Sequence, residues 1–286
     1  MKISKLLAIA VLLFAFTLNA DAQTLKTPAP SPLQTIDQAF GLGNIKIEYS
    51  RPSVKGRKVF GDLVPFGKVW RTGANSASKI TFGDTVKVEG NSVNPGTYAL
   101  YTVPNNGEWE IMLYKDLTLG GNVGEYKKED ELLRFKVKEV TSAEKVETFT
   151  INVADVTSNS ANIQLMWDNS RIAFKVATDV DTRVMKNIDS ALEKDGRPYF
   201  AAANYYYDNN KDLKKALEWA DLAYAQNPKG FFIVHLKAKI QMKMKDYQGA
   251  MKSAEKSMEI AKAEKNDDYV KLNEKLIAEA KTGGVK

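Results

Sequence analysis

The fold of the first half of this chain is decided by residues 94–114, which read NPGTYALYTVPNNGEWEIMLY. Two turn sequences, NPG at 94–96 and PNNG at 104–107, flank two runs rich in β-branched and aromatic residues, a pattern that predicts a β-hairpin. The second strand is apolar on both faces, with Trp109, Ile111 and Leu113 on one and Met112 and Tyr114 on the other. A strand of that kind is buried on both sides.

Outward from this hairpin, the period of two continues through residues 33–179. Ile45, Ile47 and Tyr49 alternate with polar neighbours, and so do the apolar residues near positions 80–88. Further strands are expected at Leu133–Glu139, Val146–Val153, Ala161–Trp167 and Ile172–Val176, the last two joined by an Asp168-Asn169-Ser170 turn. About nine or ten strands with short turns and no helices between them favour an antiparallel β-sandwich of jelly-roll-like type over residues 33–179.

Near Asp179 the apolar period changes from two to about 3.6. Asp181 can cap a helix that runs to Lys194, and a 34-residue repeat follows, counted from Arg197. Its positions 4, 11, 20, 27 and 32 are Phe200, Tyr207, Ala216, Ala223 and Pro228, the residue types of a tetratricopeptide repeat. A second unit from Phe231 keeps the spacing at Ala238 and Ala250 but departs from the pattern at Gln241 and Lys262. With a last helix at Asp268–Lys281, residues 180–286 are predicted to form a short tetratricopeptide-like helical domain.

The first residues predict export. Lys2 and Lys5 precede a 13-residue apolar run, Leu6–Leu18, and Ala20-Asp21-Ala22 supplies small residues for signal peptidase. The run is too short to span a membrane, which takes about 20 residues. We therefore expect residues 1–22 to be removed by cleavage after Ala22, and residues 23–32, rich in proline, to form an extended leader. The chain has no cysteine, so its core alone must hold a periplasmic or extracellular protein together.

Composition narrows the available chemistry. The formal net charge of +6 is concentrated in one segment rather than spread over a broad face, which argues against nucleic-acid binding. With no cysteine and one histidine there is no thiol nucleophile, no zinc-thiolate site and no histidine cluster, so we expect no metal and no cofactor. The glycine pairs near positions 41–43 and 120–121 lack the lysine of a phosphate-binding loop and are interpreted as turns.

The basic segment, Asn44–Asn75, is the predicted ligand surface of the β domain. It carries seven Lys and Arg residues against two acidic ones, and its irregular middle contains a tryptophan. Seven like charges so close together repel one another unless an anion compensates them. The candidate ligand residues for an anionic or sugar ligand are Arg51, Arg57, Lys58, Trp70, Arg71 and Asn75. Each arginine has a second interpretation, in which it braces the loop as part of the structure.

A hydrolase is the alternative from a different class, because a glycosidase needs only two carboxylates at a suitable separation. Glu108 and Glu110 flank Trp109, and Asp168 follows Trp167. Nothing in the sequence brings two of these carboxylates together. A scaffold without a small ligand is the third possibility.

Two runs in this chain resemble a known family. They read YSRPSVKGRKVFGDLVPFGKVWRTGAN, residues 49–75, and NPGTYALYTVPNNGEWEIMLYKD, residues 94–116. Both are similar to the exported bacterial family called domain of unknown function 2911, and the resemblance covers about residues 30–176. It implies a secreted, mostly β domain followed by tetratricopeptide-like helices, and it implies no activity.

The helical repeats suggest a second binding surface. If the tetratricopeptide register holds, the concave groove is lined by Tyr205, Asp208, Asn209, His235, Lys239, Met242 and Lys243. Lys239 and Lys243 are four residues apart and share one helical face. Such a groove would suit a peptide that carries an acidic side chain or a free C-terminal carboxylate. Alternatively, two repeats are too few for a groove and the helices only stabilise the sandwich. The sequence therefore predicts an exported, non-enzymatic binding protein with a ligand site in the β domain and a protein-docking surface on the helices.

Overall fold

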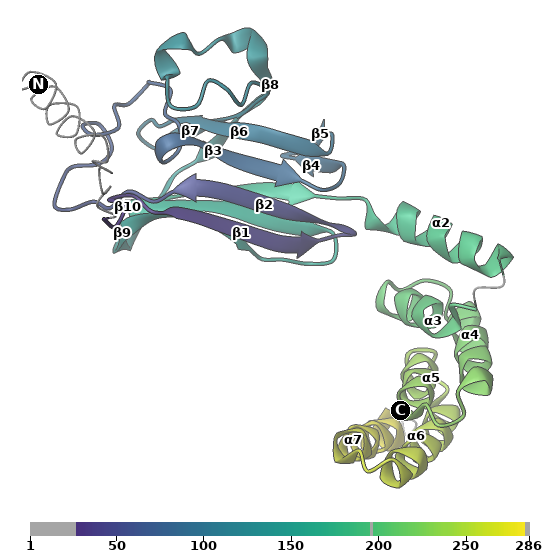
Figure 1. The fold of residues 1–286 in the computed structure, drawn as a ribbon. Coiled ribbons are helices and arrows are strands. Elements are labelled where there is room, and N and C mark those ends of the chain that lie inside the picture. Colours follow the sequence, from purple (N-terminus) through teal and green to yellow (C-terminus); the bar gives the residue numbers. More distant parts are fainter. Residues whose placement is uncertain (1–26, 195–196, 284–286) are drawn as a thin grey trace, which may run out of the picture. The chain divides into compact units, whose positions relative to one another are not determined.

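The computed structural model describes residues 27–194 and 197–283. The chain divides into two compact units with the boundary between Asp179 and Val180, named here the β unit and the helical unit (Figure 1). The expected signal peptide, residues 1–22, and the first residues of the leader lie outside the described residues.

The β unit contains a six-stranded antiparallel sheet in the order β1-β2-β3-β6-β7-β8. Its strands are β1 (Leu33–Phe40), β2 (Gly43–Ser50), β3 (Ala74–Phe82), β6 (Gly96–Val103), β7 (Glu108–Tyr114) and β8 (Glu131–Lys138). The hairpin predicted from residues 94–114 is confirmed, because β6 and β7 pair with Ala99 opposite Tyr114 and Val103 opposite Glu110. In this order β1 and β8 are the edge strands.

A second antiparallel sheet has four strands in the order β5-β4-β10-β9. They are β4 (Val86–Val88), β5 (Asn91–Val93), β9 (Val140–Ala154) and β10 (Ser160–Ala177). β10 pairs with β9 through residues 162–171 and with β4 only at Val176 and Ala177. The stretch of β10 between these two pairings therefore lacks a strand partner in the described residues.

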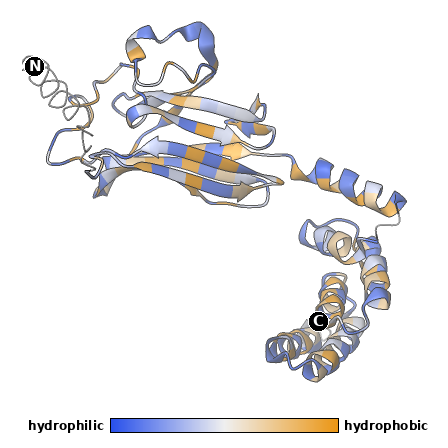
Figure 2. Ribbon diagram, viewed as in Figure 1, coloured by the Kyte–Doolittle hydropathy of each residue, from blue (hydrophilic) through white to orange (hydrophobic). Residues whose placement is uncertain are grey.

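One hydrophobic cluster takes side chains from both sheets. Hydrophobic and hydrophilic residues alternate along β2 (Figure 2), so one face of this strand is apolar. Ile45 and Ile47 from the first sheet and Ile163 and Phe174 from the second are almost fully buried in this cluster. Burying side chains of this size stabilises a fold by about 1.5–3 kcal/mol each.

A polar contact also ties the first hairpin to the second sheet. The hydroxyl of Tyr49 in β2 accepts a hydrogen bond from Ile151 N at 2.9 Å and donates to Ile151 O at 3.1 Å or to Gln34 Oε1 at 2.7 Å. Because Ile151 lies in β9, residues about 100 positions apart meet at this point. The phenol is buried there with its hydrogen-bonding capacity used.

The other face of the six-stranded sheet is covered by the loop between β7 and β8. This loop contains two short 3-10 turns, η1 (Val123–Glu125) and η2 (Lys128–Asp130). Met112 and Tyr114 pack under it with Leu119 and Tyr126. The two-sided burial that the sequence predicted for residues 109–114 is therefore confirmed, and the cover is a loop rather than a second sheet.

The predicted Asp168-Asn169-Ser170 turn is wrong. β10 runs through these residues without reversing, and they form an irregularity opposite β9 with register shifts on both sides of Asp168. Asp168 has φ of 50°, the left-handed conformation that aspartate tolerates better than most residues. Residues suited to a turn here build a β-bulge that bends a long strand.

The helical unit consists, in its described part, of six helices. They are α2 (Val180–Glu193), α3 (Tyr199–Asp208), α4 (Leu213–Gln226), α5 (Phe231–Lys243), α6 (Tyr247–Ala263) and α7 (Asp267–Gly283). From α3 onward each helix packs against the next one in sequence, and α5 also contacts α7. Fully buried alanines such as Ala216, Ala220 and Ala250 lie at these contacts and let the helices approach closely.

Candidate functional site

The basic segment is fastened to two strands that lie elsewhere in the sequence. Ser53 forms a bridge with Thr148 of β9, and Trp70 forms one with Thr102 of β6. At the second bridge, Trp70 N donates to Thr102 O at 2.7 Å and Thr102 N donates back at 3.0 Å. The side chains of this segment are therefore displayed from a backbone with fixed anchors.

The three arginines of the predicted ligand site donate to oxygens of the protein itself. Arg51 donates from Nε to Phe149 O (3.1 Å) and from Nη2 to Thr150 Oγ1 (2.8 Å). Arg57 donates from Nε to Val54 O (3.0 Å) and from Nη2 to Ser53 O (2.6 Å). Arg71 donates from Nη1 to Gly121 O (3.4 Å). Backbone oxygens and the Thr150 hydroxyl thus take the place that an anion would occupy. These contacts match the bracing interpretation of each arginine.

Trp70 lies in the core rather than on the loop surface. Its indole is 9 % exposed and Nε1 donates to Gly73 O at 3.1 Å. The ring stacks on Trp167 with centroids 5.8 Å apart, and it meets Phe60, Trp109 and Phe149 edge-on. Its area therefore contributes mainly to packing.

Arg71 and Asn75 share one neighbour, the backbone of Gly121 in the loop that covers the sheet. A Cβ added at Gly121 would stand 2.5 Å from Asn75 O and 3.0 Å from Arg71 Nη1. Asn75 also donates from Nδ2 to Ser50 Oγ at 3.2 Å and to Ser31 O at 3.3 Å. The structure brings these two candidate residues together as a structural junction that only glycine fits at position 121.

Lys58 is the candidate whose side chain stays in solvent. It is exposed, and within the described residues its ammonium makes no ion pair. Arg57 bonds only to the turn that carries it. The two pockets described below have none of the six candidates in their lining.

The carboxylates of the hydrolase alternative are paired with cations of the neighbouring strand. Glu108 Oε1 lies 2.8 Å from Lys136 Nζ, and Glu110 contacts the Arg134 guanidinium. Arg134 also bonds to Glu131, and this hydrogen bond is the main cause of a lowered pKa at Glu131 and a raised pKa at Arg134. These groups act as a charge ladder across β7 and β8.

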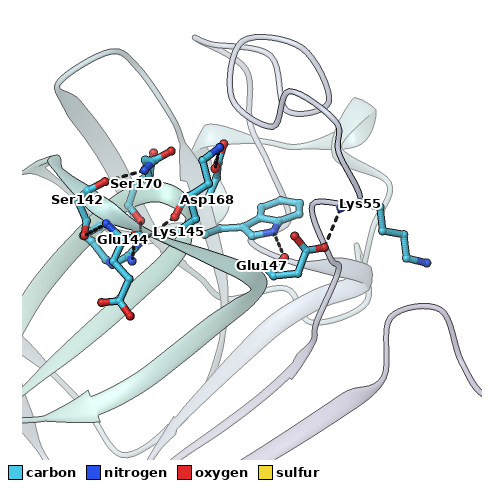
Figure 3. A network of polar contacts seen from close by, with 10 residues as sticks. Lys55, Ser142, Glu144, Lys145, Glu147, Asp168 and Ser170 are labelled. Carbon is cyan, nitrogen blue, oxygen red and sulfur yellow. Dashed lines mark hydrogen bonds and ion pairs between the residues drawn. The ribbon is translucent and has the colours of Figure 1, made fainter.

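A polar network surrounds the bulge of β10 (Figure 3). Asp168 Oδ1 lies 3.1 Å from Lys145 Nζ, while Glu147 Oε1 accepts a bond from Lys55 N at 2.8 Å. Trp167 Nε1 donates to Glu147 O at 3.3 Å. In Figure 3 the two carboxylates belong to separate branches, each with its own partner. The network fixes β9 and β10 around the bulge.

A pocket of about 580 Å³ lies where β8 and β10 line a common space. Its apolar lining includes Val137, Met166 and Ile172, and its polar lining is mostly cationic. The full lining is Glu89, Lys136, Val137, Lys138, Val140, Gln164, Met166, Arg171, Ile172 and Ala173. This space, named the β8–β10 pocket, combines an apolar surface with an excess of positive charge.

The cations of the β8–β10 pocket differ in availability. Arg171 donates to Asp168 O and Ser170 O through Nη1 and to Glu144 O through Nη2, so it holds the bulge. Lys136 pairs with a glutamate of β7. Lys138 is exposed and has no ion pair in the described residues. The Lys-Val-Lys alternation at 136–138 was visible in the sequence, but its position at a sheet edge was not.

A second, polar pocket of about 640 Å³ lies at the loop between β7 and β8. Its lining includes Tyr114, Asp116, Tyr126 and Asp130. The hydroxyl of Tyr114 donates to Asp130 Oδ2 at 3.3 Å, and burial is the main cause of a raised pKa at Tyr114 and Tyr126. These tyrosines are therefore neutral donors that hold the loop on the sheet.

The lysines of the predicted groove meet at Tyr207 of α3. Lys239 and Lys243 of α5 each place Nζ 4.6 Å from the centroid of its ring, and Lys243 Nζ also donates to Tyr207 O at 2.7 Å. Cations held against an aromatic face in this way are stabilised by its quadrupole. The predicted shared face of the two lysines is thus seen in the geometry.

The remaining groove candidates have partners inside the helical unit. Tyr205 donates from its hydroxyl to Asp181 Oδ1 at 2.8 Å and accepts Asn209 Nδ2 at its carbonyl at 2.9 Å. Asp208 Oδ2 accepts Asn204 Nδ2 at 2.7 Å. These bonds link α2, α3 and the turn after α3.

His235 lies in a buried polar cluster between α5, α6 and α7. Its Nδ1 is 2.8 Å from Oδ1 of Asn273, which is fully buried and donates to Ser257 Oγ at 2.9 Å and to Tyr269 O at 2.7 Å. Burial is the main cause of a lowered pKa at His235. Because Asn273 Oδ1 can only accept, Nδ1 carries the proton in this arrangement.

Residues 27–194 and 197–283 contain neither a metal-binding cluster nor a membrane-spanning helix. Within them, His, Cys, Asp and Glu residues form no group of three or more that could hold a metal ion. No helix among these residues has the length and apolar character required to cross a membrane.

Comparison with known proteins gives one match. A family model described as "Protein of unknown function (DUF2911)" matches residues 31–176. No curated protein and no solved structure matches the chain. The matched range includes the basic segment and all residues of the β8–β10 pocket.

Proposed function

The chain belongs to the DUF2911 family of proteins of unknown function, and from its own residues we propose that it is a non-enzymatic binding protein. The β unit holds an anionic ligand in the β8–β10 pocket. The helical unit docks a protein partner through a separate surface. The two sheets of the β unit form a β-sandwich, a proposal supported by the single core that both share.

One observation supports the ligand site: the β8–β10 pocket joins apolar surface to more cations than carboxylates. Lys136, Lys138 and Arg171 line it against the single carboxylate of Glu89. Ligand sites commonly combine an apolar wall with a few placed polar groups. Lys138 is the cation with no partner of its own, so it is the residue expected to meet the ligand's charge.

Docking by the helical unit is supported by its repeated geometry. α4 and α6 begin 34 residues apart, and Asp212 and Asp246 cap them in the same way by accepting backbone N–H groups. We therefore read α3–α6 as two tetratricopeptide-like repeats and α7 as their cap. Lys239 and Lys243, both near Tyr207, provide a positive surface for a carboxylate of the partner.

Export completes the proposal. The amino-terminal sequence supports cleavage after Ala22 and a mature protein that starts at Gln23 in the periplasm or outside the cell. Mass spectrometry of the native protein tests this, with Gln23 or its cyclised form expected as the first residue. A mature chain that retains Met1 contradicts export by signal peptidase.

The ligand site is tested by comparing two charge reversals. Lys138→Glu changes the β8–β10 pocket, and Lys58→Glu changes an exposed lysine of the basic segment by the same two charges. In a screen of anionic saccharides and acidic peptides by calorimetry, Lys138→Glu is expected to lower affinity at least about tenfold, or about 1.4 kcal/mol. Lys58→Glu is expected to leave it within about twofold.

The opposite ranking would place the ligand at the basic segment. Equal binding by the wild type and both variants would refute an anionic site at either position. Binding of uncharged sugars with no salt dependence would refute the charge argument itself, because screening weakens exposed charge interactions.

A further inference from the structure

The backbone N–H and C=O groups of β8 alternate in direction along the strand. Glu139 N donates to Gly107 O at 2.9 Å, one step beyond the pairing of Lys138 with Glu108. In an antiparallel ladder, hydrogen-bonded and non-hydrogen-bonded pairs alternate. Val137 and Phe135 therefore bond to β7, whereas Lys136 and Lys138 direct their backbone N–H and C=O away from it.

This outward edge of β8 is open. In the described part of the chain β8 pairs only with β7, so the outward groups of Lys136 and Lys138 have no strand partner. Both residues line the β8–β10 pocket. The pocket is thus bordered by a row of backbone donors and acceptors at alternate residues.

β10 contributes unpaired backbone groups to the same pocket. Lys175 exchanges hydrogen bonds with Glu89, from Glu89 N to Lys175 O at 3.0 Å and from Lys175 N to Glu89 Oε1 at 2.5 Å. Ala173 is two residues earlier and points its N–H and C=O the same way, but it has no ladder partner among the described residues. Ala173 also lines the pocket.

We propose that the β8–β10 pocket binds an extended acidic peptide segment of another protein, which adds to β8 as a further strand. This inference rests on the proposed function, because it names the ligand class of the same pocket. Strand addition uses main-chain hydrogen bonds for affinity and alternate side chains for specificity. The peptide's carbonyls and amides meet those of Lys136 and Lys138, and alternate side chains enter the apolar pocket.

The charge of the edge selects the peptide. Lysines on a free edge keep ordinary strands from pairing with it. A strand that carries carboxylates removes this repulsion, and a glutamate or aspartate opposite Lys138 forms a cross-strand pair. The apolar side chains that such a peptide needs in between correspond to Val137, Met166 and Ile172 of the lining.

A matched pair of variants separates strand addition from simple charge attraction. Lys136→Pro removes the outward N–H and the lysine side chain, whereas Lys136→Ala removes only the side chain. Neither change removes a hydrogen bond between β8 and β7, because Lys136 N points to the open edge, where proline is tolerated. Their difference therefore reports the backbone bond alone.

The probe is a short peptide that alternates valine with glutamate, labelled with fluorescein and measured by anisotropy on the full-length protein. We expect Lys136→Pro to bind it about tenfold more weakly than Lys136→Ala, and Lys138→Glu to weaken it further. Amide hydrogen exchange of the wild type is the second measurement. Peptide addition should slow exchange of the Lys136 and Lys138 amides. Because this measurement uses the wild type, it does not depend on the folding of any variant.

Four results overturn the inference. If Lys136→Pro and Lys136→Ala bind the peptide with equal affinity and the peptide adds no amide protection, the pocket binds anions without strand addition. If small polyanions bind and the peptide does not, strand addition is refuted and the proposed anion-binding function still holds. Sedimentation that shows dimers of the protein alone, with protected β8 amides, assigns the edge to a second copy of this chain. Failure of every anionic probe removes the proposed function as well.

Discussion

Replacing Asn273 by alanine should destabilise the helical unit by about 3 kcal/mol. Asn273 is fully buried and makes three hydrogen bonds, to His235 Nδ1, Ser257 Oγ and Tyr269 O, at 2.7–2.9 Å. Each such bond contributes about 1 kcal/mol net, and removal of one side chain leaves its buried partners unsatisfied. The three together give the expected loss.

The assay is urea denaturation of the full-length protein followed by far-UV circular dichroism, which reports the helices. Two units can unfold in separate transitions, so the midpoint of the helical transition is the quantity to compare. In a thermal scan, about 3 kcal/mol corresponds to a shift of about 12–24 °C for a unit of about 100 residues. Glu274→Ala is the matched control, because Glu274 is the next residue of α7 and is exposed. It should change stability by less than about 0.5 kcal/mol.

A loss below about 1 kcal/mol for Asn273→Ala would refute this reasoning. It would mean that alanine packing between α5, α6 and α7 holds these helices without the polar cluster. A loss equal to that of Glu274→Ala would refute any role of burial at this position.

Three further predictions concern single positions. Asp212→Ala should lower the free energy of unfolding by about 1 kcal/mol and shift the urea midpoint down, because the Asp212 carboxylate caps two backbone N–H groups of α4. Asp246→Ala should lower it by a similar amount, because Asp246 caps α6. His235 has a lowered pKa in the folded state, so the unfolded chain binds more protons than the folded chain as pH falls below about 6.5. The helical unit should therefore lose stability between pH of about 6.5 and the folded pKa of His235. His235→Gln should flatten this dependence of stability on pH. Gly121→Ala should destabilise the β unit by about 1–3 kcal/mol and lower its melting temperature, since the added Cβ would stand 2.5 Å from Asn75 O. An unchanged melting curve would show that the loop simply moves aside.

The hairpin of residues 94–114 could be predicted because its turns and its two-sided apolar pattern are local properties. The bulge at Asp168 could not. Its Asp-Asn-Ser sequence suits a turn equally well, and pairing of Asp168, Ser170 and Arg171 with β9 keeps the strand extended. The β1 strand, Leu33–Phe40, was likewise within the expected β region but became definite only through its register with β2.

The candidate ligand residues show where sequence reasoning stops. The charge excess of the basic segment is real, but Arg51 and Arg71 donate to Phe149 O and Gly121 O, backbone oxygens about 100 and 50 positions away. Carbonyl oxygens occur at every residue, so no sequence pattern marks them. The β8–β10 pocket has the same difficulty, because the open edge at Lys136 and Lys138 depends on the order of strands in the sheet.

The 34-residue period was readable because helices that pack on their sequence neighbours carry the pattern locally. Ala216 and Ala250, predicted at close helix contacts, are both fully buried. The cap Asp246 stands 34 residues after Asp212, as the period requires. The polar cluster around Asn273 was not predicted, since a buried asparagine on an amphipathic helix looks the same as a surface one.

The contact of Tyr49 with Ile151 has a consequence for the order in which the protein matures. The first hairpin leaves Ile45 and Ile47 without their partners until β9 has been made, about 100 residues later. Long-range strand pairing of this kind is slow, whereas helices that contact their neighbours form quickly. Once the whole chain is available, we expect the helical unit to fold first and the β unit to be completed afterwards, although the β unit is synthesised earlier. During that interval the apolar strands of the β unit are exposed to aggregation.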